Sequence, residues 1–381
     1  MAIKYYKIDF PNLGTHAQVA LFNAESEVCE WHVMLHLEPH KDMFAQQLER
    51  LYKTEELLLQ ADGFEDARCI MKRYFLSDST NQQPLMRHQT DVATSIIQQQ
   101  PLDGSKIAAW LYLQSHMQVT TKDDMVVAEH NGYSHLWKMG MHKAVGDSAQ
   151  QTEAILSEYE KALHNQGACL ADNCVRTWFF VRDVDTQYAG MVKARKDNFA
   201  QQGLTEHTHY IASTGIGGLP ADTHALIQMG AYAIMGLLPG QQRYLYAPTH
   251  LNPTYEYGVT FERGTCVEYG DRAHVLISGT ASIDNHGNVM HVGDIISQTY
   301  RMWENVETLL KEAGTTYDDV MQIVVYLRDT ADYHMVKQMF DERFPDIPTV
   351  IALAPVCRPT WLIEMECMAV KKRDNVGFPN Y

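Results

Sequence analysis

The chain has 381 residues, more than a single hydrophobic core usually organises, so two or three domains are expected. Its formal net charge of -16 argues against a nucleic-acid partner, because binding a phosphate backbone requires clustered Lys and Arg. No uncharged apolar run is long enough to span a bilayer, and the N-terminal stretch MAIKYYKIDFPNLG has no apolar signal core. The seven cysteines include no CxxC pair, which is typical of reduced thiols. We therefore expect a cytoplasmic globular protein that binds neither membrane nor nucleic acid.

The first third of the chain is predicted to contain strands and one amphipathic helix. Residues 31–37 (WHVMLHL) are predicted to form a strand. A helix is expected to begin at Gln47 and to end at Gly63, since glycine is the usual residue after a helix C-terminus. Two further strands are predicted at 69–78 and 106–114.

The middle third repeats this order. It has a predicted strand at 134–140 (SHLWKMG) and a helix that extends from Gln151 to Gly167. A strand, a second helix and two closing strands are then expected at 174–183, 187–199, 209–217 and 224–234.

The last third repeats the order again. Residues 275–283 (VLISGTASI) are a predicted strand, and a helix is expected from Gln298 to Gly314. The remaining strand, helix and two closing strands are predicted at 321–329, 332–344, 349–356 and 361–370.

The spacing of these elements indicates an internal repeat. In each third the helix runs from a glutamine to a glycine sixteen residues later, and the following strand ends at an aspartate, namely Asp78, Asp183 or Asp329. The sequence therefore predicts three α+β units, at residues 1–120, 125–240 and 250–371, with a proline-marked linker at 237–258.

Each predicted unit packs two helices against a mostly antiparallel sheet, which leaves one face of the sheet uncovered. Three units in one chain can bury these faces against one another around a pseudo-threefold axis, as three separate chains do in a cyclic trimer. We expect a monomeric pseudo-trimer, or a low-order homo-oligomer of it.

The third unit resembles a known family. The stretches ISGTASIDNHGNVMHVGDIISQTYRMWENVETLLKEAG, VVYLRDTADYHMVKQMF and LIEMECMAV resemble the Rid superfamily, also called YjgF, UK114 or endoribonuclease L-PSP-like. The resemblance implies chorismate-mutase-like units with ligand sites in the clefts between them. It also implies hydrolysis of reactive enamines and imines.

Several stretches are also similar to the chorismatases, which are Rid-related enzymes of similar length. They are RTWFFVRD followed by Arg195 and Phe199, then STGIGG, YEYGVTFERG, SGTASI and CRPTWLIE. This resemblance implies hydrolysis of an enol ether with release of pyruvate.

The sequence departs from both groups at positions that bind substrate. The arginine that grips the substrate carboxylate in deaminating Rid enzymes corresponds to Pro348, a family asparagine to Lys337, and a family tyrosine to Phe261. The chorismatase YGPR-like stretch has the sequence YGVT at 257–260 and lacks its arginine. These differences argue against imine deamination as the reaction and against chorismate as the substrate.

Two carboxylates one residue apart, Glu364 and Glu366, interrupt an apolar strand. One interpretation is that both glutamates lie on a solvent-exposed face of an antiparallel sheet, where glutamate is common. However, aligning HALIQMGAYA with TWLIEMECMA pairs Glu364 with Gln228 and Glu366 with Gly230. This asymmetry indicates that one of three clefts carries chemistry, and we predict Glu364 as its general acid, with a pKa raised by burial.

Other residues are predicted to bind the substrate. Arginine binds a carboxylate through paired N–H groups, and the alternative for each arginine is a solvated surface position. Backbone N–H groups at a Ser–Gly pair and two aromatic walls complete the predicted site, although simple core packing is the alternative for the aromatic residues. The predicted substrate-binding residues are Arg263, Arg358, Arg195, Ser278, Gly279, Tyr257 and Phe261.

The sequence thus predicts a hydrolase without cofactor or metal that acts on a small carboxylate-bearing enol ether or enamine. A chorismatase-like reaction is the first reading. A Rid-type enamine or imine deaminase, and a non-catalytic metabolite-binding or regulatory protein that uses the same cleft, are the alternatives.

Overall fold

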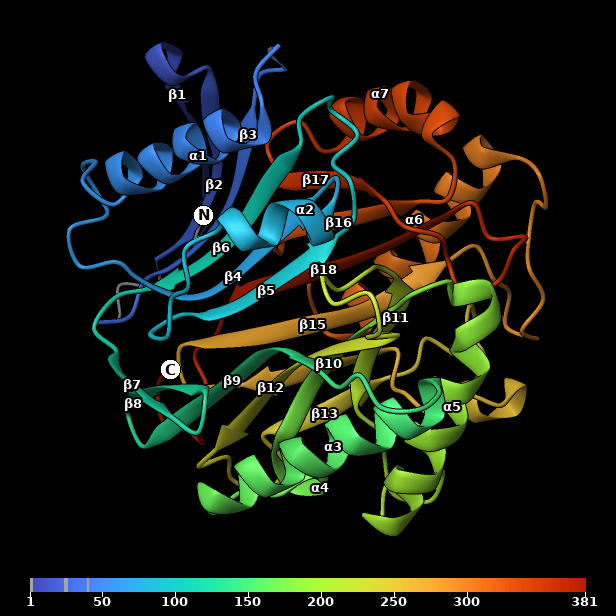
Figure 1. The fold of residues 1–381 in the computed structure, drawn as a ribbon. Coiled ribbons are helices and arrows are strands. Elements are labelled where there is room, and N and C mark those ends of the chain that lie inside the picture. Colours follow the sequence, from blue (N-terminus) through green and yellow to red (C-terminus); the bar gives the residue numbers. More distant parts are fainter. Residues whose placement is uncertain (1–2, 24–26, 40) are drawn as a thin grey trace.

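A computed structural model describes residues 3–23, 27–39 and 41–381. The chain forms three six-stranded mixed sheets, one from each consecutive third (Figure 1). The strands of the first sheet are β1 (Ile3–Phe10), β2 (Thr15–Phe22), β3 (Glu30–Leu37), β4 (Arg68–Leu76), β5 (Ala93–Gln98) and β6 (Ile107–Gln114). Those of the second are β7 (Gln118–Lys122), β8 (Met125–His130), β9 (Tyr133–His142), β10 (Cys174–Val181), β11 (Ala212–Gly217) and β12 (Ile227–Met235). Those of the third are β13 (Gln242–Leu245), β14 (Gly264–Glu268), β15 (Arg272–Ala281), β16 (Val320–Leu327), β17 (Thr349–Leu353) and β18 (Ile363–Lys372).

The three sheets share one topology, as the repeat predicts. The first has the order β1-β2-β3-β6-β4-β5, and the other two follow the same pattern. Each sheet is antiparallel except for one parallel pair, β4 with β5, β10 with β11 or β16 with β17. The sheets differ in two places from the predicted division of the chain. Strand β7 joins the second sheet, and β13 lies in the stretch expected to be a linker, where it pairs with β14.

The helices are α1 (Phe44–Leu58), α2 (Ser79–Gln82), α3 (Ser148–Asn165), α4 (Leu170–Asn173), α5 (Val184–Gln201), α6 (Ile295–Glu312) and α7 (Tyr333–Arg343). Helices α3 and α6 begin three residues before the predicted glutamine, because Asp147 and Asp294 cap them by accepting hydrogen bonds from N–H groups of the first turn. The second helix of the first unit is reduced to the single turn α2, which a 3-10 turn containing Pro84 follows. The expectation of two helices per unit therefore holds fully only for the second and third units.

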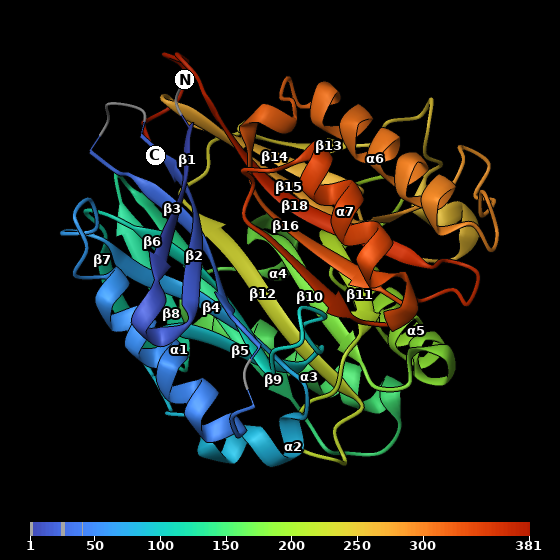
Figure 2. The same cartoon turned by 90° about the horizontal axis from the view of Figure 1, so that it is seen from above.

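The helices lie on the outside of the molecule, and the other faces of the sheets meet at its centre (Figure 2). Strand β5 packs beside β9, β11 beside β15, and β16 beside β2 and β3. A single hydrophobic cluster contains buried side chains from all three units, such as Trp110, Trp178 and Tyr326. The uncovered sheet faces are thus buried against one another, which confirms the intrachain pseudo-trimer. No helix in the described part of the chain combines the length and apolar character needed to cross a bilayer.

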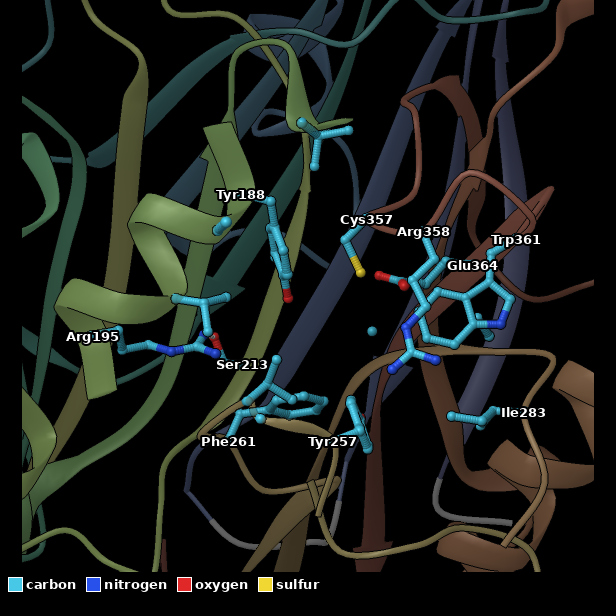
Figure 3. Close-up of a pocket in the computed structure, with 18 of the residues that line it drawn as sticks. Tyr188, Arg195, Ser213, Tyr257, Phe261, Ile283, Cys357, Arg358, Trp361 and Glu364 are labelled. Carbon is cyan, nitrogen blue, oxygen red and sulfur yellow. Dashed lines mark hydrogen bonds between the residues drawn. The ribbon is translucent and has the colours of Figure 1, made fainter. Parts of the chain in front are cut away.

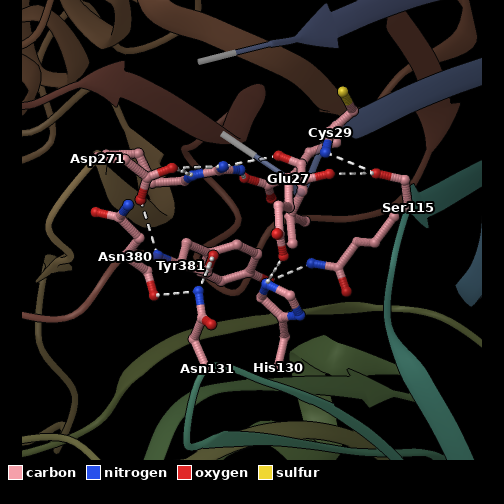
Figure 4. Close-up of polar contacts among 12 residues, drawn as sticks. Glu27, Cys29, Ser115, His130, Asn131, Asp271, Asn380 and Tyr381 are labelled. Atoms are coloured by element: carbon pink, nitrogen blue, oxygen red, sulfur yellow. Dashed lines mark hydrogen bonds and ion pairs between the residues drawn. The ribbon is translucent and has the colours of Figure 1, made fainter. Parts of the chain in front are cut away.

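One end of the central junction is closed by the segment that ends in Tyr381 (Figure 4). The backbone N–H of Tyr381 donates to Asp271 at 2.8 Å, and Asn131 of the second unit donates to the carbonyl of Asn380 at 3.3 Å. The Tyr381 ring is buried and lies 4.9 Å from the His135 ring and 4.5 Å from the His274 ring, measured between centroids. This side chain therefore connects the second and third units at the axis.

We expect Tyr381→Ala to lower the free energy of unfolding by about 3 kcal/mol, because truncating a buried aromatic residue leaves a cavity. Urea denaturation followed by circular dichroism measures the change. Val376→Ala is the matched control, since Val376 lies on the same segment and is fully exposed. Equal stabilities of the two variants would show that the ring contributes little to the junction.

Candidate active site

A cavity of about 340 Å³ lies between the second and third units (Figure 3). Helix α5 and strand β11 form one wall, and β15, β18 and residues 257–263 form the other. Seven of the eight predicted site residues line it, namely Glu364, Arg263, Arg358, Arg195, Gly279, Tyr257 and Phe261. The structure thus brings together residues from two units that are up to 169 positions apart in the chain.

Ser278 is the exception. Its hydroxyl donates to the carbonyl of Glu262 at 2.6 Å and accepts from the backbone N–H of Ser213 at 2.9 Å. Both bonds are buried, so Ser278 joins β15 to β11 and does not face the cavity. Ser213, which the sequence analysis did not select, lines the cavity instead.

Glu364 lies on β18 with only 5% of its surface exposed. No hydrogen bond to its carboxyl group is found among the described residues. Burial and the charge of Glu366 together raise its pKa to about 8, although Arg176 and Arg263 act in the opposite direction. The Glu364 carboxyl group is therefore largely protonated at neutral pH and faces the cavity.

Glu366, two residues further along β18, is ionised, whereas Glu364 is protonated. It is 1% exposed and accepts hydrogen bonds from Arg73 at 3.0 Å and from Arg176 at 2.7 Å. The Trp178 N–H and the Thr214 hydroxyl also donate to it. Burial alone would raise its pKa, but Arg176 and Arg73 hold it below the usual range. The reading of a solvated sheet face is therefore wrong for both carboxylates.

The absence of a side chain at Gly279 leaves space for the Glu364 carboxyl group. A Cβ atom at this position would collide with Oε1 of Glu364 and would lie 2.9 Å from its Cδ. The Gly279 N–H donates to Thr214 at 2.9 Å, and Thr214 in turn donates to Glu366. The glycine predicted to let a ligand approach the backbone thus makes room for the acid.

Each of the three arginines has at least one protein partner. The guanidinium of Arg263 donates to the carbonyl of Asn252 at 2.9 Å and lies over the rings of Tyr257 and Phe261. Arg358 donates to the carbonyl of Gly287 at 3.2 Å. Its guanidinium is 4.8 Å from the Tyr257 ring centroid and 4.7 Å from that of Trp361. Arg195 makes one side-chain hydrogen bond, to the Ser213 hydroxyl at 3.4 Å.

Tyr188 and Ser213 also line the cavity, although neither was predicted as a site residue. Tyr188 lies seven residues, or two helical turns, before Arg195 on α5, so the two residues share one face of the helix. This helical periodicity was the signal that could have identified Tyr188. Its ring packs against Gly215, where a Cβ would lie 3.0 Å from Tyr188 Cε2. Cys357 also lines the cavity, but burial and the nearby Glu364 raise the pKa of its thiol to about 12. A reactive thiolate is therefore not present at Cys357.

In the other two units, the residue at the position of Glu364 has no carboxyl group. Between the first and second units, Gln228 donates to Ser95 at 3.3 Å and to the Ile96 carbonyl at 3.2 Å. Between the third and first units, a cavity of about 240 Å³ remains. There the strand ladder pairs Ala108 with Phe75, as it pairs Glu364 with Tyr326 in the third unit. Within the described chain, the cleft between the second and third units alone carries Glu364.

Comparison with known proteins agrees with this architecture. Residues 266–371 match the family described as Endoribonuclease L-PSP. A RutC family protein of Pyrococcus abyssi is 33% identical over 100 residues, which are 26% of this chain and 79% of that protein. The 3-aminoacrylate deaminase RutC of Acinetobacter baylyi is 38% identical over 72 residues, 19% of this chain and 57% of that protein.

A chorismatase crystal structure superposes on 90% of this chain and 99% of its own with a TM-score of 0.66 and 16% identity. It therefore shares the fold of three tandem units. The chain belongs to the Rid superfamily, the endoribonuclease L-PSP family. Within that superfamily it is a fusion of three units with the fold of the chorismatase structure.

We expect Glu366→Gln to lower the free energy of unfolding by about 3 to 5 kcal/mol, because it leaves Arg73 and Arg176 buried without their counter-charge. Glu364→Gln is the matched control, and we expect it to fold as stably as the parent at pH 5.

The Glu364 carboxyl group of the parent protein has a pKa raised from 4.5 to about 8, so burial of its neutral form favours folding most at low pH. The parent should therefore lose stability relative to Glu364→Gln between pH 4.5 and 8. Parallel curves for the two proteins over this range would contradict the raised pKa.

Proposed function

We propose that this protein is a cofactor-free hydrolase of a small carboxylate-bearing enol ether or enamine, with a chorismatase-like reaction as the first choice. The observation that carries the proposal is Glu364, a buried carboxylic acid with a pKa of about 8 that faces a cavity lined by arginines. A neutral acid in this position is suited to protonating a carbon–carbon double bond at neutral pH. The ionised Glu366 beside it takes no part in proton transfer, because protein donors occupy both of its oxygens.

The reaction begins when Glu364 transfers its proton to the terminal CH₂ carbon of the enol ether. The double-bond electrons form the new C–H bond, and an oxocarbenium ion remains at the carbon that carries the ether oxygen. The Glu364 carboxylate, now negative, stabilises this cation in a site of low dielectric constant. Water then adds to the cationic carbon while Glu364 accepts its proton. The resulting hemiketal releases the alcohol and pyruvate, so one water molecule is consumed and the acid is regenerated.

Enamine hydrolysis follows the same first step and releases ammonia in place of the alcohol. The likeness to a protein named 3-aminoacrylate deaminase RutC supports this second candidate. The replacement of the family's carboxylate-binding arginine by Pro348 weighs against it, because Pro348 offers no cation and its carbonyl accepts from the N–H of Ile323 at 2.9 Å. We therefore rank enol-ether hydrolysis above deamination.

A coupled assay tests the proposal. Purified protein is incubated with chorismate, and separately with 2-(benzyloxy)acrylate, while lactate dehydrogenase and NADH report pyruvate. We expect turnover with at least one of the two enol ethers, and a decrease of about 100-fold or more in Glu364→Gln, since general acid catalysis contributes that much. Pyruvate release from neither substrate would overturn enol-ether hydrolysis. The same assay with enzymatically generated 2-aminoacrylate would then separate a deaminase from a protein that only binds its ligand.

The pH dependence of turnover is a second test. Because the protonated form of Glu364 is the reactive one, the rate should stay level up to about pH 8 and fall tenfold for each pH unit above it. The coupling enzyme is kept in excess at each pH, and far-ultraviolet circular dichroism verifies that the fold persists. A rate that instead rises through pH 8 would assign Glu364 as a base and reverse the mechanism.

A further inference from the structure

Tyr188 places a second group that can transfer a proton in the cavity, on the wall opposite Glu364. It lies on α5 of the second unit and lines the cavity, whereas Glu364 lies on β18 of the third unit. Figure 3 shows the Tyr188 hydroxyl and the Glu364 carboxyl group pointing into the space between the two walls. A ligand in this space would therefore have a carboxylic acid on one side and a phenol on the other.

The Tyr188 hydroxyl keeps its proton at neutral pH. Burial and the nearby Cys357 raise its pKa well above the usual value, although the charge of Arg195 acts in the opposite direction. Burial also raises the pKa of the Cys357 thiol, to about 12, so this neighbour is neutral, and a thiol sulfur is a weak acceptor. Among the described residues, no carbonyl or carboxylate oxygen accepts a hydrogen bond from Tyr188. Its O–H group is thus available to a ligand.

Each of the two groups lies against a glycine that leaves space for it. A Cβ atom at Gly279 would collide with the Glu364 carboxyl group. On β11, a Cβ atom at Gly215 would lie 3.0 Å from Cε2 and 3.3 Å from the hydroxyl oxygen of Tyr188, which is closer than non-bonded atoms normally pack. The absence of a side chain at Gly215 therefore lets the phenol ring lie beside the cavity.

Arg195 lies near the Tyr188 hydroxyl on the same face of α5 and is 1% exposed. Burial lowers the pKa of Arg195, and Tyr188 is the ionisable group that affects it most. Its Nη1 donates to Ser213 at 3.4 Å, while Nε and Nη2 have no hydrogen-bond partner in the described part of the structure. No carboxylate forms an ion pair with Arg195 among these residues. Its positive charge can therefore stabilise the negative charge that arises on the Tyr188 oxygen when the phenol gives up its proton.

The proposed reaction needs a proton donor on this side of the cavity. The oxocarbenium ion is planar, and water adds to the face that Glu364 covers, because Glu364 accepts the proton of that water. The new C–O bond forms on this face, so the ether oxygen moves away from Glu364 and toward the α5 wall. An alkoxide is a poor leaving group, and its C–O bond breaks readily when an acid protonates the departing oxygen.

We infer that Tyr188 is a second catalytic acid of the site and that Arg195 is a positioning residue, which stabilises the Tyr188 oxygen after proton transfer. This inference rests on the proposed function. Tyr188 gives its proton to the alcohol oxygen of the hemiketal as the C–O bond breaks, and the electron pair of that bond stays with the alcohol. An electron pair of the hemiketal hydroxyl oxygen forms the carbonyl of pyruvate, and the hydroxyl proton passes through a water molecule to the Tyr188 oxygen. Both Tyr188 and Glu364 are then protonated again.

The dependence of kcat on the leaving group tests this inference. The coupled pyruvate assay is run with 2-(benzyloxy)acrylate, whose alcohol is a weak acid, and with 2-(4-nitrophenoxy)acrylate, whose phenol leaves without a proton. We expect Tyr188→Phe to lower kcat about 100-fold with the benzyl ether, because acid catalysis of the departure is lost, and to leave kcat with the nitrophenyl ether nearly unchanged. Tyr300→Phe is the matched control, since it removes the same hydroxyl from an exposed position on α6, and it should change neither rate.

Arg195 is tested with the same two ethers. Arg195→Met should lower kcat selectively for the benzyl ether, and Arg195→Lys, which keeps a positive charge, should recover most of that loss. Far-ultraviolet circular dichroism verifies that each variant is folded. Equal loss of kcat with both ethers in Arg195→Met would show that the arginine does not act through Tyr188.

The two proposals fail in different ways. If the parent protein releases pyruvate and Tyr188→Phe releases it from the benzyl ether at the same rate, or is slowed equally with both ethers, hydrolysis stands and this inference is wrong. If the parent releases pyruvate from neither ether, enol-ether hydrolysis is wrong and the inference is wrong with it.

Discussion

The buried charge of Glu366 is the constraint on which the candidate site depends. Its partners are Arg73 from the first unit and Arg176, Trp178 and Thr214 from the second, while Glu366 itself belongs to the third. A charge in this position is tolerated only because several donors surround it, so the three units must be assembled around it. Burial raises the pKa of Glu364, two residues away on the same strand face, and the charge of Glu366 adds to this effect. One ion network thus joins the units and helps to keep the neighbouring acid protonated.

Fusion of three units in one chain permits the three clefts between the units to differ in their side chains. A trimer of identical chains must place the same residues in all three clefts, whereas here each cleft has its own side chains. At the position of Glu364, the second unit has Gln228, which donates hydrogen bonds to β5, and the first unit has Ala108. The cleft between the second and third units combines a neutral acid with a buried guanidinium, that of Arg195, whose Nε and Nη2 have no hydrogen-bond partner among the described residues. Such a division of roles between ionisable groups is typical of an active site.

Much of the fold was predictable because hydrophobic periodicity and the glutamine-to-glycine spacing recur three times along the chain. Several elements were not predicted, since their pairing partners decide their structure; these are the short α2 and the strands β1, β2, β5, β7, β8, β13 and β14. The resemblance to a known superfamily placed Arg263 and Gly279 at one cleft, and the difference between the last strands of the second and third units selected Glu364. Ser278 does not line the cavity, because whether a strand residue faces a cavity or a neighbouring strand depends on the bulge between Ile277 and Thr280.

The sequence by itself determined the repeat, the α+β class and the presence of a carboxylate pair in one unit only. Local periodicity and turn residues encode such features, and they can be read without knowing the partners. Only the tertiary structure decided which glutamate is ionised and which protein groups each arginine contacts. Those properties depend on burial and on donors contributed by other units, such as Arg73, which lies 293 residues from Glu366 in the chain. The chemistry of the site is therefore a property of the assembled units.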